Sequence, residues 1–272
     1  MRSVGVHYKR WAYRPYDAAL FIALARELGY DQVELDAERL AGGSVLTRTR
    51  IGFEARTHRI DLSYTWSAET ESDLASLDEA RRRGAVAYGS EIIKAIGQMG
   101  GGSLNGAFYA AFPPHWELAG QADRLFGQAV KSLRSLAWVA ESEDVLLNIK
   151  PIGRSEHFLI PNVERALTFV QAVNHSALGL DLDTYHMACE EQSIEEAIVQ
   201  AGVYLKTVHV RDSTQTRVGE GTIDWAAVRR GLDGVHYDGP LIHNPIITSE
   251  VATTVHESNF IRSLLIEESP PS

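Results

Sequence analysis

Charged side chains follow directly on an apolar run in the middle of the chain. The run Val145-Leu146-Leu147 leads to Lys150, and Arg154 and Glu156 come soon after it. An ammonium group beside a substrate could stabilise developing negative charge on a carbonyl oxygen, and a nearby carboxylate could move a proton. The chemistry of this segment therefore depends on which other groups the fold brings to Lys150.

A second group of chemically active residues lies further along the chain. Asp183, His186 and His209 are residue types that ligate metals. Period-two alternation places Asp181 and Asp183 on the same face of a strand, with Asp183 nearer its end. A divalent site needs roughly three or four ligands, usually with carboxylates in the majority for Mg²⁺ or Mn²⁺. One well-placed carboxylate and one imidazole are too few, so these residues alone do not predict a metal site.

Short β-rich runs alternate with longer amphipathic segments along the whole chain, and no Pro/Gly/Ser-rich linker divides them. This alternation predicts an α/β fold, a single (β/α)₈ TIM barrel domain over residues 1–272. The rival is a doubly wound open sheet, but no GxGxxG motif follows the first strand, and Gly100-Gly101-Gly102 reads as a turn before a strand. The expected strands are Val4–Tyr8, Gln32–Leu35, Asp61–Trp66, Leu104–Phe112, Val145–Ile152, Leu178–Thr184, Leu205–Val210 and Pro240–Ile246. The expected helices are Asp17–Leu28, Ser72–Gln98, Gln121–Ser142, Val163–Val173, Ile194–Ala201, Trp225–Leu232 and Glu250–Ile266.

The active site of such a barrel lies where its strands end. Aromatic side chains at the ends of the first, third and fourth strands would form an apolar wall, and polar groups from the fifth to eighth strands would face it. This is the makeup of a small-ligand pocket, although each aromatic alone is better explained by core packing. The residues expected to bind the substrate are Tyr8, Trp11, Trp66, Phe112, Arg154, Arg217 and Asn244.

Composition limits the class of partner. The formal net charge of −10 argues against nucleic acid. No apolar stretch approaches the ~20 residues of a membrane span, and the N-terminus lacks the apolar region of a signal peptide. A single cysteine excludes an intrachain disulfide and fits a reducing compartment. We expect a cytoplasmic protein that binds a small molecule and neither nucleic acid nor a membrane.

Several segments resemble the D-tagatose 3-epimerase/D-allulose 3-epimerase group of the sugar phosphate isomerase/epimerase-like (xylose isomerase-like) barrels, over nearly the whole chain. The segment Leu182-Asp183-Thr184-Tyr185-His186-Met187 is close to the family's LDT[FY]HM and is the most specific match. The start of the chain, Val4 to Tyr8 with Trp11, resembles the family's first strand. Val208-His209-Val210 and Gly219-Glu220-Gly221 resemble its seventh strand and the following loop.

The resemblance implies a metal site that this chain has altered. The family binds a divalent cation, commonly Mn²⁺ or Co²⁺, through Glu, Asp, His and Glu on strands five to eight, and both glutamates move the proton. Its strand-five segment, similar to E-x-x-N-R-x-E, begins here with Lys150, and Asn244 stands at the strand-eight glutamate. Because an ammonium repels a dication, we expect no Mn, Co or Mg cofactor. Lys150 would take the metal's place and pair with Asp183, with Asn244 and His209 within reach.

Two alternatives to metal loss stay open at this level. Both strands could be misaligned with the family pattern, although Arg154, Glu156 and Pro245 anchor them. Another carboxylate could rescue a metal site. The candidates are Asp181, Asp212 and Glu156, and Asp212 is the best placed because it is adjacent to the end of the seventh strand.

Three functions compete. By resemblance, Glu156, His186 and Arg217 contact the O1–O3 end of a sugar. The preferred hypothesis is a metal-independent isomerase, epimerase or dehydratase for a sugar-derived or small polar carbonyl compound, with Lys150 as the cation and a nearby base. A Lys150 Schiff-base lyase or aldolase is the second. The third is a catalytically silent barrel that binds a sugar-like ligand or a partner protein. Relatives of this kind form homodimers or homotetramers, and the expected catalytic residues are Lys150, Asp183, His209, His186 and Glu156.

Overall fold

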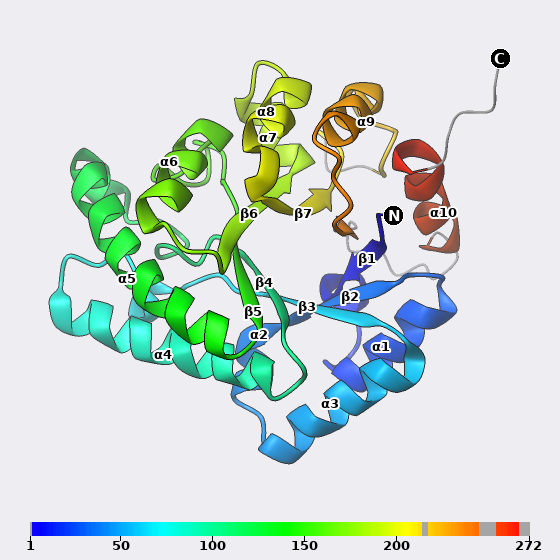
Figure 1. Cartoon of the computed structure of the whole chain (residues 1–272), viewed down its shortest axis with the longest axis horizontal. Helices are drawn as coiled ribbons and strands as arrows, with labels where there is room; N and C mark the ends of the chain where they lie inside the picture. The colour runs from blue at the N-terminus through cyan, green and yellow to red at the C-terminus, as the bar shows by residue number, and fades with distance from the viewer. Residues whose placement is uncertain (1, 214–216, 245–253, 267–272) are drawn as a thin grey trace.

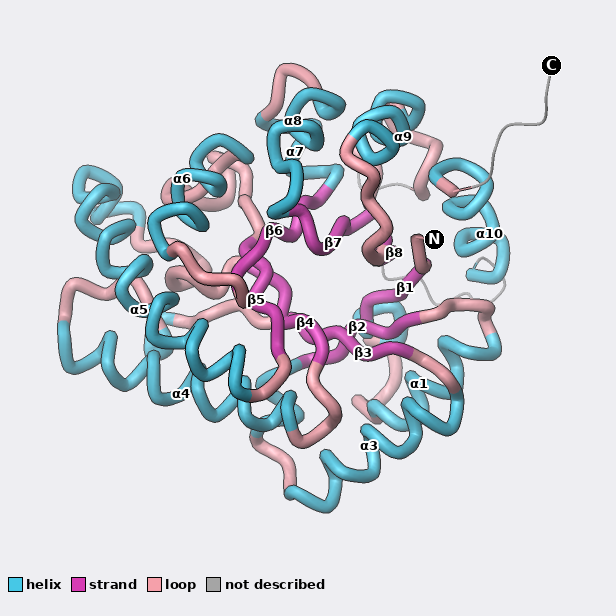
Figure 2. Tube along the Cα trace, viewed as in Figure 1, coloured by secondary structure: helices cyan, strands magenta, loops and turns pink. Residues whose placement is uncertain are grey.

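Parallel strands close into a barrel at the centre of the molecule (Figures 1 and 2). A computed structural model describes residues 2–213, 217–244 and 254–266. Within these residues each strand pairs in parallel with the next, and the last strand pairs with the first. The expected (β/α)₈ TIM barrel is therefore confirmed. The strands are β1 (Val4–His7), β2 (Gln32–Asp36), β3 (Asp61–Thr65), β4 (Gly102–Gly106), β5 (Val145–Ile149), β6 (Leu178–Asp183), β7 (Leu205–Val210) and β8 (Leu241–His243).

Helices surround the barrel and cover the outer face of the strands, as the tube in Figure 2 shows. No helix in the described part of the chain is long and apolar enough to cross a membrane. The helices are α1 (Ala18–Glu27), α2 (Ala37–Ala41), α3 (Val45–His58), α4 (Glu79–Gly97), α5 (Ala122–Ser142), α6 (Val163–Val173), α7 (Thr184–Glu190), α8 (Ile194–Ala201), α9 (Trp225–Gly234) and α10 (Thr254–Leu265).

Local sequence sets where these helices begin. Asp17, Ser44 and Asp78 each accept a backbone N–H from the first turn of the helix that follows. Asn162 caps α6 by accepting the Arg165 N–H at 3.0 Å. Such caps satisfy amide groups that have no partner inside the helix, and they fix the point where each loop from the barrel mouth turns back.

Strand β4 is much shorter than the sequence predicts. The expected strand Leu104–Phe112 is wrong, because β4 ends at Gly106. Gly106 has a φ of 137°, and a side chain there would collide with the Trp66 carbonyl oxygen. The aromatic residues beyond it therefore lie in a loop. The predicted turn is present before this strand and ends at Gly100; Gly102 is already the first residue of β4, and all three glycines have positive φ angles.

Three helices in the described residues were not expected: α2, α3 and α7. α3 carries exposed Val45, Leu46 and Phe53, so its apolar residues do not mark one buried face. α7 begins at Thr184, directly after β6, and Asp183 caps it by accepting the Tyr185 N–H at 3.0 Å. This cap fixes the Asp183 backbone at the barrel mouth. Residues 245 and 246 of the expected last strand lie outside the described residues.

Candidate functional site

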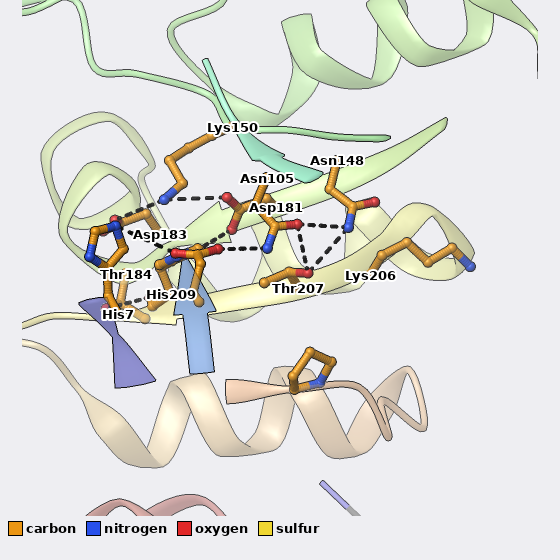
Figure 3. A network of polar contacts seen from close by, with 12 residues as sticks. His7, Asn105, Asn148, Lys150, Asp181, Asp183, Thr184, Lys206, Thr207 and His209 are labelled. Carbon is orange, nitrogen blue, oxygen red and sulfur yellow. Dashed lines mark hydrogen bonds and ion pairs between the residues drawn. The ribbon is translucent and has the colours of Figure 1, made fainter. Parts of the chain in front are cut away.

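Lys150 projects from the end of β5 toward two carboxylates on β6 (Figure 3). Its Nζ lies 3.3 Å from Asp181 Oδ2 and 3.8 Å from Asp183 Oδ2. Both carboxylates are buried, with relative exposures of 0% and 1%. The expected pair with Asp183 is present, and Asp181 is the nearer partner. A lysine thus ends this strand because two buried carboxylates at its edge need a cation.

His209 on β7 lies between two carboxylates. Its Nδ1 is 2.6 Å from Asp181 Oδ1, and its Nε2 is 2.8 Å from Glu34 Oε2 on β2. Carboxylate oxygens only accept, so both ring nitrogens must donate, which requires an imidazolium. Burial alone would lower the pKa of His209, but Asp181 and Glu34 raise it to about 9. His209 has no lone pair available, so it is a buried cation here and not a general base.

Glu34 is the main site residue that the sequence analysis did not select. It is completely buried and accepts a hydrogen bond from Asn105 Nδ2 at 2.7 Å. Burial alone would raise its pKa, but His209, with smaller contributions from His7 and Lys150, holds it well below the ordinary range. A carboxylate inside an otherwise buried strand is the signal that could have identified Glu34, because an acid at such a position needs a cation from another strand.

Asp183 has a second cationic partner that was also missed. Arg211, just beyond β7, places Nε 3.2 Å from Asp183 Oδ1 and Nη2 3.1 Å from Oδ2. This two-point contact suits the planar guanidinium. Burial alone would raise the pKa of Asp183, but Arg211 and Lys150 hold it well below its ordinary value. Arg211 Nη2 also lies 3.2 Å from His186 Nε2, which links α7 to the same group.

His186 is the neutral imidazole of the site. It is buried, its Nε2 faces Arg211, and its Nδ1 lies 3.4 Å from the Gly153 N–H. Burial lowers its pKa, and Asp183 only partly opposes this. A neutral imidazole has one acceptor nitrogen, and both ring nitrogens of His186 face donors, so this acceptor takes its hydrogen bond from Arg211 or from Gly153.

The charges of this cluster balance. We call Glu34, Lys150, Asp181, Asp183, His209 and Arg211 the mouth cluster; its members are three carboxylates and three cations in contact with one another. A divalent ion would need several of these carboxylate oxygens, yet each carboxylate already has a cationic partner. Among the described residues no group of three or more His, Cys, Asp or Glu side chains is arranged to hold a metal ion. The donor set present does not fit a dication.

Asp212, which the sequence indicates as the best placed alternative metal ligand, has a different role. It is buried and accepts the Ser213 N–H at 2.7 Å, the Gly219 N–H at 2.8 Å and the Trp225 indole N–H at 3.3 Å. Burial raises its pKa, but these donors lower it below the ordinary value overall. Asp212 holds the loop between β7 and α9, and among the described residues no hydrogen bond or ion pair joins its carboxylate to the mouth cluster.

The expected aromatic wall is only partly at the surface of the site. Tyr8 is half-buried, stacks on His7 and donates to Asp36 Oδ2 at 3.1 Å. Phe112 is also half-buried. Trp11 and Trp66 are 3% and 1% exposed and stack on Phe21 and Phe108, respectively. These two indoles belong to the hydrophobic core behind the wall.

The expected polar residues separate into different places. Arg154 is 67% exposed and pairs with Glu190 on α7 at 3.3 Å. It lines a cavity of about 430 Å³ together with Glu190 and Glu191, none of which belongs to the mouth cluster. Glu156 is half-buried in the loop after β5 and acts electrostatically on His186. Arg217 is exposed in the loop after β7, and Asn244 is half-buried directly after β8.

Comparison with known proteins gives one consistent family. The model of the family described as "Xylose isomerase-like TIM barrel" matches residues 22–264. A D-psicose 3-epimerase of Ruminiclostridium cellulolyticum is 28% identical over 244 residues, which cover 89% of this chain and 83% of that protein. An L-ribulose 3-epimerase of Methylomonas sp. is 29% identical over 228 residues, covering 81% and 75% of the two chains.

A solved structure has the same fold over its whole length. The D-psicose 3-epimerase from Clostridium cellulolyticum H10, solved with D-tagatose, superposes with a TM-score of 0.92. It is 25% identical, and the match covers 97% of this chain and 99% of that one. The proteins that this barrel is similar to are thus sugar epimerases.

Proposed function

Because the chain belongs to the xylose isomerase-like TIM barrel family, we propose that it is an isomerase- or epimerase-like enzyme that works without a metal. Its substrate would be a sugar-derived or other small polar carbonyl compound. The observation that supports this most directly is the position of Lys150. Its ammonium lies between Asp181 and Asp183, at 3.3 and 3.8 Å, in a cluster whose charges already balance.

Lys150 would supply the positive charge at the reacting carbonyl. The side chain is 12% exposed, so its outer face can meet a ligand while Asp181 and Asp183 hold it from below. When a proton leaves the carbon next to a carbonyl, negative charge gathers on the oxygen. A preorganised ammonium stabilises that charge without moving.

The general base would be His186 or Glu156. His186 is the better candidate, because burial lowers its pKa and keeps the imidazole neutral at neutral pH; to act as a base it would exchange the hydrogen bond from Arg211 or Gly153 for the substrate proton. Glu156 is half-buried nearby and carries a carboxylate with no hydrogen bond to a described residue. His209, which was also a candidate by sequence, holds its proton between two carboxylates and would act as a fixed cation.

A Schiff-base mechanism is the weaker alternative. It requires Lys150 to lose its proton and to leave both of its carboxylate partners, so that Asp181 and Asp183 would each keep a single cationic partner, His209 and Arg211, respectively. The non-catalytic alternative has one observation in its favour: every charge of the mouth cluster has an internal partner. A barrel that only binds a ligand would need no free base.

Exchange of hydrogen for deuterium next to the carbonyl tests this function. Protein treated with EDTA would be incubated in D₂O with a panel of ketoses and keto acids, and the exchange followed by proton NMR. We expect exchange that EDTA does not abolish, and a loss of about a hundredfold or more in Lys150→Gln. The matched control is Lys94→Gln, which removes an exposed lysine charge near the end of α4 and should change nothing.

Other outcomes would contradict the proposal. Exchange that appears only after Mn²⁺ or Co²⁺ is added would show that the reaction depends on a metal ion. Ligand binding without exchange for any compound would favour the non-catalytic barrel. Trapping of a substrate on Lys150 by borohydride would instead favour the lyase mechanism.

A further inference from the structure

The charges at the barrel mouth are arranged by depth. Glu34, Asp181 and His209 are 0% exposed, whereas Lys150 and Arg211 are 12% and 21% exposed. The carboxylates of the mouth cluster and His209 therefore lie beneath Lys150 and Arg211. A ligand that arrives from solvent meets the ammonium and the guanidinium first.

Lys9 adds a further cation at the same end of the barrel, two residues after His7, whose Nε2 lies 3.6 Å from Glu34 Oε2 of the mouth cluster. It follows β1 directly, and its backbone N–H donates to His7 Nδ1 at 3.1 Å, which fixes the start of this short turn. Its side chain is exposed, and no hydrogen bond or ion pair joins its ammonium to another described residue. Partial burial of the ammonium, together with Lys150 and Arg211, lowers the pKa of Lys9. The three cations thus act on one another across the mouth.

The neighbouring acids do not cancel Lys9. Asp36 acts on it, but the Asp36 carboxylate already accepts from Tyr8, pairs with Arg39 at 3.2 Å and caps α2. Glu34 acts on it more weakly and is fully engaged with His209. Lys9 is therefore an extra positive charge above a cluster that is neutral without it.

We propose that the mouth binds a small anionic carbonyl compound, whose carboxylate or phosphate group lies against Lys9 and Arg211 while its carbonyl faces Lys150. This inference rests on the proposed function for the role of the carbonyl but not for the binding of the anion. Charge-assisted hydrogen bonds from Lys and Arg to an oxyanion are stronger than bonds to neutral hydroxyl groups. A neutral sugar would leave the excess charge of Lys9 without a partner.

Binding measurements with compounds of similar size test the inference. Isothermal titration calorimetry would compare D-fructose, 2-keto-D-gluconate and D-fructose 6-phosphate, with inorganic phosphate as a fourth probe. We expect at least one of the two anionic carbonyl compounds to bind about tenfold or more tightly than D-fructose. Its affinity should fall as the salt concentration is raised. The carboxylate and phosphate compounds distinguish the two anionic groups. Inorganic phosphate shows how much of the affinity comes from the anion alone.

Variants of single residues test where the anion binds. Lys9→Gln removes an exposed charge and should leave the fold intact. We expect it to lower the affinity for the anionic compound about tenfold and to leave the affinity for D-fructose nearly unchanged. Lys94→Gln, which removes an exposed charge near the end of α4, should change neither. Equal affinity for the neutral and anionic compounds, or no effect of Lys9→Gln, would overturn the inference.

Different results would contradict the catalytic function and the anion site. An anionic compound that binds through Lys9 without deuterium exchange would support the anion site and contradict the catalytic function. Exchange with D-fructose alone, unaffected by Lys9→Gln, would support the catalytic function and contradict the anion site.

Discussion

At the scale of single residues, the mouth cluster is defined by which group holds each proton. His209 is cationic because it faces Asp181 and Glu34, and His186 is neutral because it faces Arg211 and a backbone N–H. The sequence presents both as imidazoles near strand ends, with nothing to tell them apart. Their different roles come from partners that are distant in sequence; Glu34 and His209 are 175 positions apart.

Replacing His209 should cost much of the stability of the fold. His209→Gln leaves Glu34 and Asp181 buried without their shared cation, and we expect a loss of about 3–5 kcal/mol in the free energy of unfolding. Urea denaturation followed by circular dichroism measures this loss. His115→Gln, at a partly exposed position in the loop before α5, is the control and should change it little. A small effect at His209 would mean that the imidazolium does not hold the two carboxylates.

At the scale of elements, the alternation of strands and helices was predictable because each amphipathic segment returns the chain to a buried strand. The end of β4 was not, since it depends on the close approach of Gly106 to the Trp66 backbone, a contact between two strands. Helix α3 was missed because its exposed Leu46 and Phe53 hide the periodic pattern. For the site, the strand ends located Lys150, whereas the inward Glu34 needs the closed barrel to meet its partner.

The conformation of Gly106 gives a prediction about strand β4. With a φ of 137° and the Trp66 carbonyl in contact, Gly106→Ala should reduce the free energy of unfolding by about 1–3 kcal/mol. Gly127→Ala is the matched control. Gly127 lies at an exposed position of α5 with open space around it, so alanine there should stabilise the protein by about 0.5–1 kcal/mol. Thermal and urea denaturation of both variants measure whether each alanine raises or lowers the free energy of unfolding. Equal changes in the two variants would contradict the role of Gly106.

The ends of β5 and β8 give a prediction about metal binding. Lys150→Glu combined with Asn244→Glu removes the ammonium and provides two carboxylates, so we expect Mn²⁺ to bind measurably by titration calorimetry. The control is Arg154→Glu with Asn244→Glu, which adds a carboxylate outside the cluster and should not bind. Stoichiometric Mn²⁺ in the parent protein would contradict the replacement of the metal by Lys150. A folded double variant that fails to bind would contradict the assignment of these two positions.

At the scale of the whole molecule, the barrel combines an acidic chain with a cationic mouth. The formal net charge is −10, yet the exposed members of the mouth cluster are Lys150 and Arg211. Stability therefore depends on pH through groups that are hidden from solvent, such as His209. The sequence predicts the total charge, but the depth of each charge follows only from the closed barrel.

Stability should fall in mildly alkaline solution. The pKa of His209 is raised from 6.5 to about 9, so its stabilising effect is fully present below pH 6.5 and is lost as the pH rises through about 9. The loss should be of the order of 3 kcal/mol, the value for a shift of this size. Asp181 and Glu34 raise this pKa and Lys150 opposes them. Urea denaturation across this range measures the slope, and His209→Gln should flatten it. Parallel curves for the two proteins would contradict the prediction.

The charge balance of the mouth cluster also constrains how this barrel can change over evolutionary time. A single substitution of Lys150 by glutamate would place a further carboxylate beside Asp181 and Asp183 while only Arg211 and His209 remain as cations. That intermediate is penalised before any metal can be held, and a change at Asn244 alone adds a further acid. Converting this site into one that holds a metal therefore requires more than one substitution at the same time. For this reason the balanced cluster is expected to persist among descendants of this protein.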